Sequence, residues 1–283
     1  MNAHELMVKT NQYLIQGGSL TAPQVNTIVR QLLAARSTES QAARYHAGVG
    51  CPGNIDRWGH RMYPSLFIPP YQDGQKLRTI FDQTPKTQLF SGNMYELEIV
   101  RLLALLAPEH PAVPGLTAEV LARLQATCFG NKDDGVGECF DASLVVLRFL
   151  ATAAPTERRW IEERIANYHR HKAEKKRSWH SAWYFWLCLS ELPYEMVRHE
   201  IDTALPEILP WVTTKSFAMN SEKDRIIHPV RLCVVRNVIG RMPGFAHIRY
   251  MQPQVSGRDG RLALHIDLPA PLRCHDAIPD TLP

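Results

Sequence analysis

Apolar and mixed segments alternate along the second half of the chain. Residues 143–151 (SLVVLRFLA) and 183–189 (WYFWLCL) have little polar face, whereas residues 156–171 carry many charges, as in ERRWIEER. A helix that is apolar all round is buried, and a helix with one charged face lies at the surface. We therefore predict buried inner helices, each followed by an amphipathic outer helix.

The helix pairs recur along the sequence. Residues 100–108 (VRLLALLAP) match residues 147–155 (LRFLATAAP) at an offset of 47 residues, which aligns Arg101 with Arg148. A third copy ends at Pro193, and a looser fourth spans residues 231–243. A period of about 40–50 residues made of helix pairs is typical of repeat architectures, because each pair leaves an apolar face for its neighbour. With an apolar inner and a charged outer layer, the pattern predicts a mainly α fold, an α/α-toroid or partial α/α barrel of roughly five hairpins.

We predict one domain over residues 1–283. Its parts are two N-terminal helices at 1–45, an irregular, lid-like insertion at 46–92, helical-hairpin repeats at 93–243, and a β-hairpin with a tail at 244–283. Short runs separated by turn signals predict small β elements near 65–81 and 245–268. Long irregular segments in compact proteins are more often functional than idle, and this favours a lid at 46–92.

The composition excludes several classes of protein. Of 283 residues, 45% are hydrophobic and 21% charged, as in globular proteins and unlike disordered or fibrous ones. The net charge of +4 is too small to indicate nucleic-acid binding. The basic run at 169–177 ends an outer helix, where cations oppose the helix dipole. We therefore expect a small-molecule substrate rather than a nucleic acid as the partner.

The sequence also bears on location. We expect no membrane span, because no apolar run approaches the roughly 20 residues that a span needs. The first residues lack the basic and apolar pattern of a secretory signal. The six cysteines form no CxxC pair, which indicates reduced thiols and predicts a cytoplasmic protein. The oligomeric state is not indicated.

Residues 124–147 follow the pattern of a known repeat. An outer helix ends in Gln125, a turn rich in glycine and aspartate follows, and a short acidic and aromatic entry leads into an apolar helix. Over residues 93–243 this pattern resembles the α/α-toroid group, which includes terpenoid cyclases and protein prenyltransferase β subunits. The resemblance implies an enzyme that acts on a small amphiphilic or sugar-like substrate in the mouth of the toroid.

The resemblance places the starts of the inner helices around that mouth. The candidates for catalysis are Asp134, Glu138, Asp141 and His180. The candidates for substrate binding are Tyr95, Glu96, Trp179, Trp183, His228 and, from the predicted lid, Arg57, Trp58 and His60. Neighbouring carboxylates shift each other's pKa values apart, as an acid and its partner base require. Aromatic side chains at the mouth stabilise a cation.

A zinc site is a second hypothesis for the same mouth. In prenyltransferase β subunits an Asp and a Cys one residue apart begin an inner helix, and a His begins a later one. Cys139, Asp141 and His180 resemble that set, with Cys and Asp in reversed order, and they supply ligand types that zinc accepts. The structural alternative remains: Glu138 and Asp141 satisfy backbone N–H groups at a helix start, and Cys139 is a small buried hydrophobe.

The leading functional hypothesis is thus carboxylate acid–base or metal-assisted catalysis. Its rival is a non-catalytic helical-repeat module that binds a peptide or protein partner across the same concavity. A deep pocket with perturbed titratable groups favours the enzyme, and an open groove favours the binding module.

Overall fold

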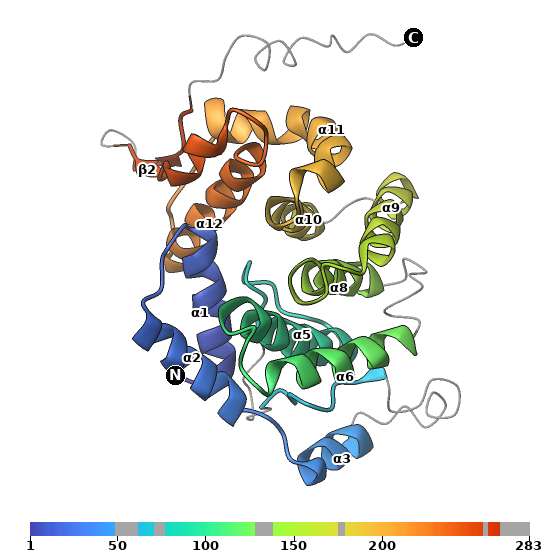
Figure 1. Ribbon diagram of the computed structural model, residues 1–283. Helices are drawn as coiled ribbons and strands as arrows, with labels where there is room; N and C mark the ends of the chain where they lie inside the picture. Colours follow the sequence, from blue (N-terminus) through green and yellow to red (C-terminus); the bar gives the residue numbers. More distant parts are fainter. Residues whose placement is uncertain (49–61, 71–76, 128–137, 175–178, 257–259, 267–283) are drawn as a thin grey trace. The chain divides into compact units, whose positions relative to one another are not determined.

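The chain is mainly helical in the computed structural model, which describes residues 1–48, 62–70, 77–127, 138–174, 179–256 and 260–266 (Figure 1). It divides into two compact units. Unit 1 comprises residues 1–12 and 19–184, and unit 2 comprises residues 13–18 and 185–283. The division falls within helices α1 (Ala3–Ile15) and α10 (Trp179–Glu191). Within the part of the chain that the structure describes, no helix has the length and apolar character to cross a membrane.

Unit 1 is built of paired helices around α5. Its further elements are α2 (Ala22–Ala34), α3 (Glu39–Gly48), α5 (Gln88–Leu106), α6 (Val113–Gln125), α8 (Cys139–Ala153) and α9 (Arg158–Glu174). Helix α5 packs against α2, α6 and α8, and α8 packs against α9 (Figure 1). Every residue of α5 from Phe90 to Leu103 is buried. Helix α9 exposes charged side chains, as at Arg159 and Glu163, although Arg164 is buried. The predicted inner and outer helices are confirmed for these pairs.

A buried ion cluster joins α5 to α8. The Arg148 guanidinium on α8 donates to both oxygens of Glu98 on α5 at 2.8 and 2.9 Å, and Arg101 Nε lies 3.5 Å from Glu98. The Tyr184 hydroxyl donates to the same carboxylate. The three charged side chains are at most 3% exposed. The two arginines that the repeat aligned at an offset of 47 residues therefore meet at one glutamate.

The strands expected near 65–81 are not formed by the described residues of that range, and this part of the prediction is wrong. The reason is visible at residues 65–67. Their backbone N–H groups donate to the carboxylate of Glu96 on α5 rather than to a neighbouring strand. A carboxylate that accepts these bonds satisfies the buried backbone as well as a β ladder would.

Unit 2 combines helices with a small sheet. Its elements are α11 (Tyr194–Thr213), β1 (Ser216–Phe217), α12 (Glu222–Ile239), the 3₁₀ helix η2 (Ala246–Tyr250), β2 (Gln254–Val255) and β3 (Leu262–Ala263). Strand β3 lies between β1 and β2 and is antiparallel to both. The predicted C-terminal hairpin is thus present as β2 and β3. The stretch 246–250, expected to be its first strand, is instead the 3₁₀ helix.

Three stacked rings hold β1 between the helices of unit 2. The ring of Phe217 lies 4.7 Å from that of Trp211 on α11 and 4.1 Å from that of His228 on α12. Nε2 of His228 lies 3.2 Å from an oxygen of Asp224, one turn earlier on the same helix. Burial lowers the pKa of His228 from its ordinary value of 6.5, as does the nearby charge of Arg231, while Asp224 opposes the shift. The neutral imidazole is therefore favoured in the folded chain.

The substitution Glu98→Gln removes the negative charge and leaves Arg101 and Arg148 buried beside a neutral amide. We expect the free energy of unfolding to fall by about 3–5 kcal/mol, measured by urea denaturation. Glu163→Gln is the matched control, because it breaks an exposed ion pair with Arg159 and should change stability little. Similar losses in both variants would show that the buried cluster does not stabilise unit 1.

Acid should destabilise the stack in unit 2. Because the folded chain holds His228 at a lowered pKa, the unfolded chain takes up this proton first as the pH falls below about 6.5. The free energy of unfolding should then fall between pH 7 and pH 5. His228→Phe keeps a ring in the stack but has no proton to gain, and should lose less stability over this interval in urea titrations. An identical pH dependence in both proteins would refute the expectation.

Candidate functional site

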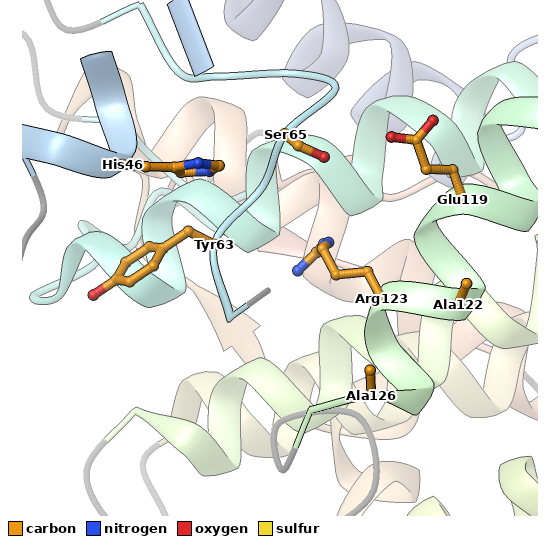
Figure 2. A pocket seen from close by; sticks show the side chains of 7 residues that line it. All are labelled: His46, Tyr63, Ser65, Glu119, Ala122, Arg123 and Ala126. Carbon is orange, nitrogen blue, oxygen red and sulfur yellow. The ribbon is translucent and has the colours of Figure 1, made fainter. Parts of the chain in front are cut away.

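A pocket of about 480 Å³ lies in unit 1 between α6, the end of α3 and the segment at 63–65 (Figure 2). The side chains that line it are His46, Tyr63, Ser65, Glu119, Ala122, Arg123 and Ala126. The four from α6 are spaced three, four and seven residues apart, so they share one face of the helix. Two of them are alanines, and their small side chains leave the space that the pocket occupies.

Arg123 is fixed by contacts on its core side. One terminal nitrogen of its guanidinium donates to Asn93 Oδ1 at 2.7 Å, and the other donates to Glu96 Oε1 at 2.7 Å. The second oxygen of Glu96 accepts the backbone N–H groups of residues 65–67 at 2.7 to 3.1 Å. The Glu96 side chain is fully buried, and that of Arg123 is 8% exposed. One carboxylate thus holds both the guanidinium and the chain segment on the opposite side of the pocket.

Gly92 on α5 allows Tyr45 and Pro64, which support the remaining wall of the pocket, to pack closely against the helix. A Cβ atom at Gly92 would lie 2.5 Å from the Tyr45 hydroxyl and 3.0 Å from a ring carbon of Pro64. The carbonyl of Pro64 can only accept a hydrogen bond, so Nε2 of His46, at 2.9 Å from it, carries a proton. The ring of Tyr45 also meets that of Tyr63 edge-on, at 6.1 Å between centroids. These contacts set the positions of His46 and Tyr63 at the pocket.

Three predicted substrate-binding residues lie in the core of unit 1. Glu96 has the contacts given above. Tyr95 and Trp183 are 1% and 2% exposed, and neither is among the residues that line the pocket. Burial raises the pKa of Tyr95 to about 12, so its hydroxyl keeps its proton at neutral pH.

Glu138 joins the starts of two inner helices. Its carboxylate accepts the backbone N–H groups of Lys86 and Thr87 and the hydroxyl of Thr87, each at 2.6 Å. Thr87 precedes α5 and Glu138 precedes α8. These two inner-helix starts therefore meet. The contacts of Glu138 are those of the structural alternative, in which a carboxylate satisfies backbone groups at a helix start.

The other predicted residues divide into three groups. Asp141 lies in the first turn of α8 and is partly exposed, and His228 belongs to the ring stack of unit 2. Cys139, Trp179 and His180 begin α8 and α10, but their side chains are not among those described. Asp134, Arg57, Trp58 and His60 lie outside the described residues. Of the side chains that are described, none form a group of three potential metal ligands.

The sequence did not reveal the pocket residues as a set. Residues 117–127 have the pattern of an outer amphipathic helix, and that interpretation does not distinguish a polar face in water from a polar face on a pocket. The available signal was the row at 119, 122, 123 and 126, where two alanines interrupt a charged face. His46 and Ser65 come from distant parts of the chain and carried no signal of their own.

Comparisons with protein-family models, with curated proteins and with solved structures found no match to this chain. The pocket and its contacts therefore carry the functional argument.

Adding a methyl group at Gly92 should disturb the wall that holds His46 and Tyr63. We expect Gly92→Ala to lower the free energy of unfolding by about 1–3 kcal/mol, because Tyr45 and Pro64 must move. Gly115→Ala on α6 is the matched control: its Cβ would meet nothing within 4 Å, and it should stabilise the helix by about 0.5–1 kcal/mol. In urea denaturation we expect the free energy of unfolding to fall in Gly92→Ala and to rise in Gly115→Ala. A stabilising Gly92→Ala would contradict the expectation.

Proposed function

We propose that the chain is an enzyme that takes a small amphiphilic or sugar-like substrate into the pocket of unit 1. The observation that supports this is the pocket itself, a space of about 480 Å³ beside a guanidinium fixed by two hydrogen bonds. Small-molecule sites typically occupy about 300–1,000 Å³ and combine an apolar lining with a few fixed polar groups. The ring of Tyr63 and the two alanines supply the apolar lining here.

The proposed catalytic groups are near the pocket in sequence. Ala126 lines the pocket and shortly precedes Asp134, and Tyr63 lines it just after His60. This nearness supports Asp134 as an acid–base candidate and the loop with Arg57, Trp58 and His60 as a lid. Asp141 and His180 are retained as acid–base candidates because they lie in the first turns of α8 and α10. Glu138 is a weaker candidate for proton transfer, because its two oxygens already accept the backbone N–H groups of Lys86 and Thr87, just before α5.

We also retain the toroid as the proposed arrangement of the hairpins. Its support is the repeat pattern, the packing of α5 against α8 and the contact between their starts through Glu138. Zinc held by Cys139, Asp141 and His180 remains the metal-assisted form of the proposal. These residues begin α8 and α10, and such a zinc ion would activate a bound water. The metal content of the purified chain and of Cys139→Ser tests this form.

Filling the pocket should abolish binding without unfolding the chain. We expect Ala122→Trp to weaken the binding of any ligand found in a panel of small amphiphiles and glycosides by at least about tenfold, measured by calorimetry, because the indole occupies the ligand's space. Ala118→Trp is the matched control, since Ala118 is exposed on the same helix and does not line the pocket. A ligand that binds both variants equally would place the site elsewhere, and a panel without any ligand would contradict the proposal.

The second candidate function is a non-catalytic module that binds a peptide or protein. It is favoured by one feature of unit 2: Tyr250 and Val255 are 84% and 58% exposed, and Val255 lies in β2, at one side of the three-stranded sheet. Exposed apolar side chains at a sheet edge are a common setting for strand addition by a peptide. Val255→Lys would weaken such binding, and Ala122→Trp would leave it unchanged.

A further inference from the structure

We infer that the ligand of the pocket is an amphiphile with a single carboxylate, which lies beside Arg123 and Ser65 with its apolar body against Tyr63, Ala122 and Ala126. This inference rests on the proposed function, and it names the class of substrate.

The ion pair between Arg123 and Glu96 has a direction. Glu96 is fully buried on the core side, and Arg123 lies between it and the pocket. The pair is a dipole with its positive end at the pocket wall. The backbone N–H groups of residues 65–67 also point at Glu96 and offset its negative charge. The member of the pair that faces the pocket is therefore the guanidinium and not the carboxylate.

Hydrogen-bond donors border the same space. Figure 2 shows the guanidinium of Arg123 and the hydroxyl of Ser65 at one region of the pocket, beside the ring of His46, whose Nε2 proton is directed at Pro64. The backbone N–H of Ser65 is held by Glu96 at 3.0 Å, so its hydroxyl is presented from a fixed position. A guanidinium and a hydroxyl are typical partners of a carboxylate. One end of the pocket thus suits a small anionic group.

Glu119 limits how much negative charge the ligand carries. It lies one turn before Arg123 on α6, is exposed, and also lines the pocket. A ligand with carboxylates at both ends would bring the second one toward this acid. The pocket therefore favours one anionic end and an uncharged remainder.

The volume indicates the size of ligand that the pocket can hold. At about 30 Å³ per water molecule, a pocket of about 480 Å³ has room for about 16 waters, and this corresponds to roughly 10–16 non-hydrogen atoms. Octanoate, with its eight carbons and two oxygens, is within this range. It is also soluble as a monomer and has close analogues that differ only in the end group.

The test compares four eight-carbon compounds by calorimetry with the full chain: octanoate, octanol, octylammonium and the dicarboxylate suberate. We expect octanoate to bind at least about tenfold more tightly than octanol, with suberate weaker than octanoate and octylammonium weakest. Ser65→Ala keeps the backbone contact with Glu96 and should weaken octanoate several-fold while leaving octanol unchanged. Glu119→Gln, an exposed substitution, should strengthen suberate selectively.

The outcomes separate this inference from the proposed function. If octanol binds as tightly as octanoate, and Ala122→Trp abolishes both, the pocket is the site but the inference of a carboxylate is overturned. The same holds if only a glycoside binds and Ala122→Trp abolishes that binding. If neither the eight-carbon compounds nor the wider panel binds, both the inference and the proposed function are overturned.

Discussion

The ion pair between Glu98 and Arg148 is the constraint on which unit 1 depends. Charges taken out of water are costly, and they are tolerated only when their partners are held in good geometry. Here the guanidinium meets both carboxylate oxygens, and Arg101 and Tyr184 contact the same group. Any displacement of α8 along α5 would separate these charges without admitting water. The pair therefore fixes the register of the two inner helices more strictly than apolar packing alone.

The same helix uses a second glutamate for a different purpose. Residues two apart on a helix point in nearly opposite directions, so Glu96 and Glu98 serve opposite sides of α5. Glu98 faces α8, while Glu96 binds Arg123 and the backbone at 65–67. The position of the pocket wall is thus coupled to the packing of the core through one helix. A helix in this role cannot present a polar face to solvent, and α5 is buried from Phe90 to Leu103.

The sequence predicted what depends on local periodicity. The buried inner helices, the charged outer helix α9, the equivalence of Arg101 and Arg148 and a C-terminal hairpin all follow from spacing along the chain. The residues at 65–67 show why the rest did not. They belong to a short apolar run between turn signals, which is typical of a strand. The partner of their N–H groups is a carboxylate some 30 residues later, and no local pattern records such a partner.

The residues of the candidate site could not be predicted as a set for the same reason, because they lie far apart in the sequence. Its walls come from α3, from 63–65 and from α6, and only the α6 row leaves a trace in one stretch of sequence. Acidic residues at helix starts are equally suited to catalysis and to binding backbone N–H groups, so residue type alone does not separate the two roles. For Glu138 the contacts with Lys86 and Thr87 are of the second kind.

The meeting of two repeat-equivalent arginines at one glutamate also bears on how such an array evolves. In an open solenoid each module carries its own contacts, so whole modules are gained or lost at little cost. Here the modules of α5 and α8 share a single acid between two bases. Deleting the module of α5, which carries Glu98, would leave Arg148 without an acidic partner. Duplicating the module of α8 would add an arginine without an acidic partner. Charge balance therefore disfavours the gain or loss of either of these two modules, whereas loops and outer helices are free of this constraint.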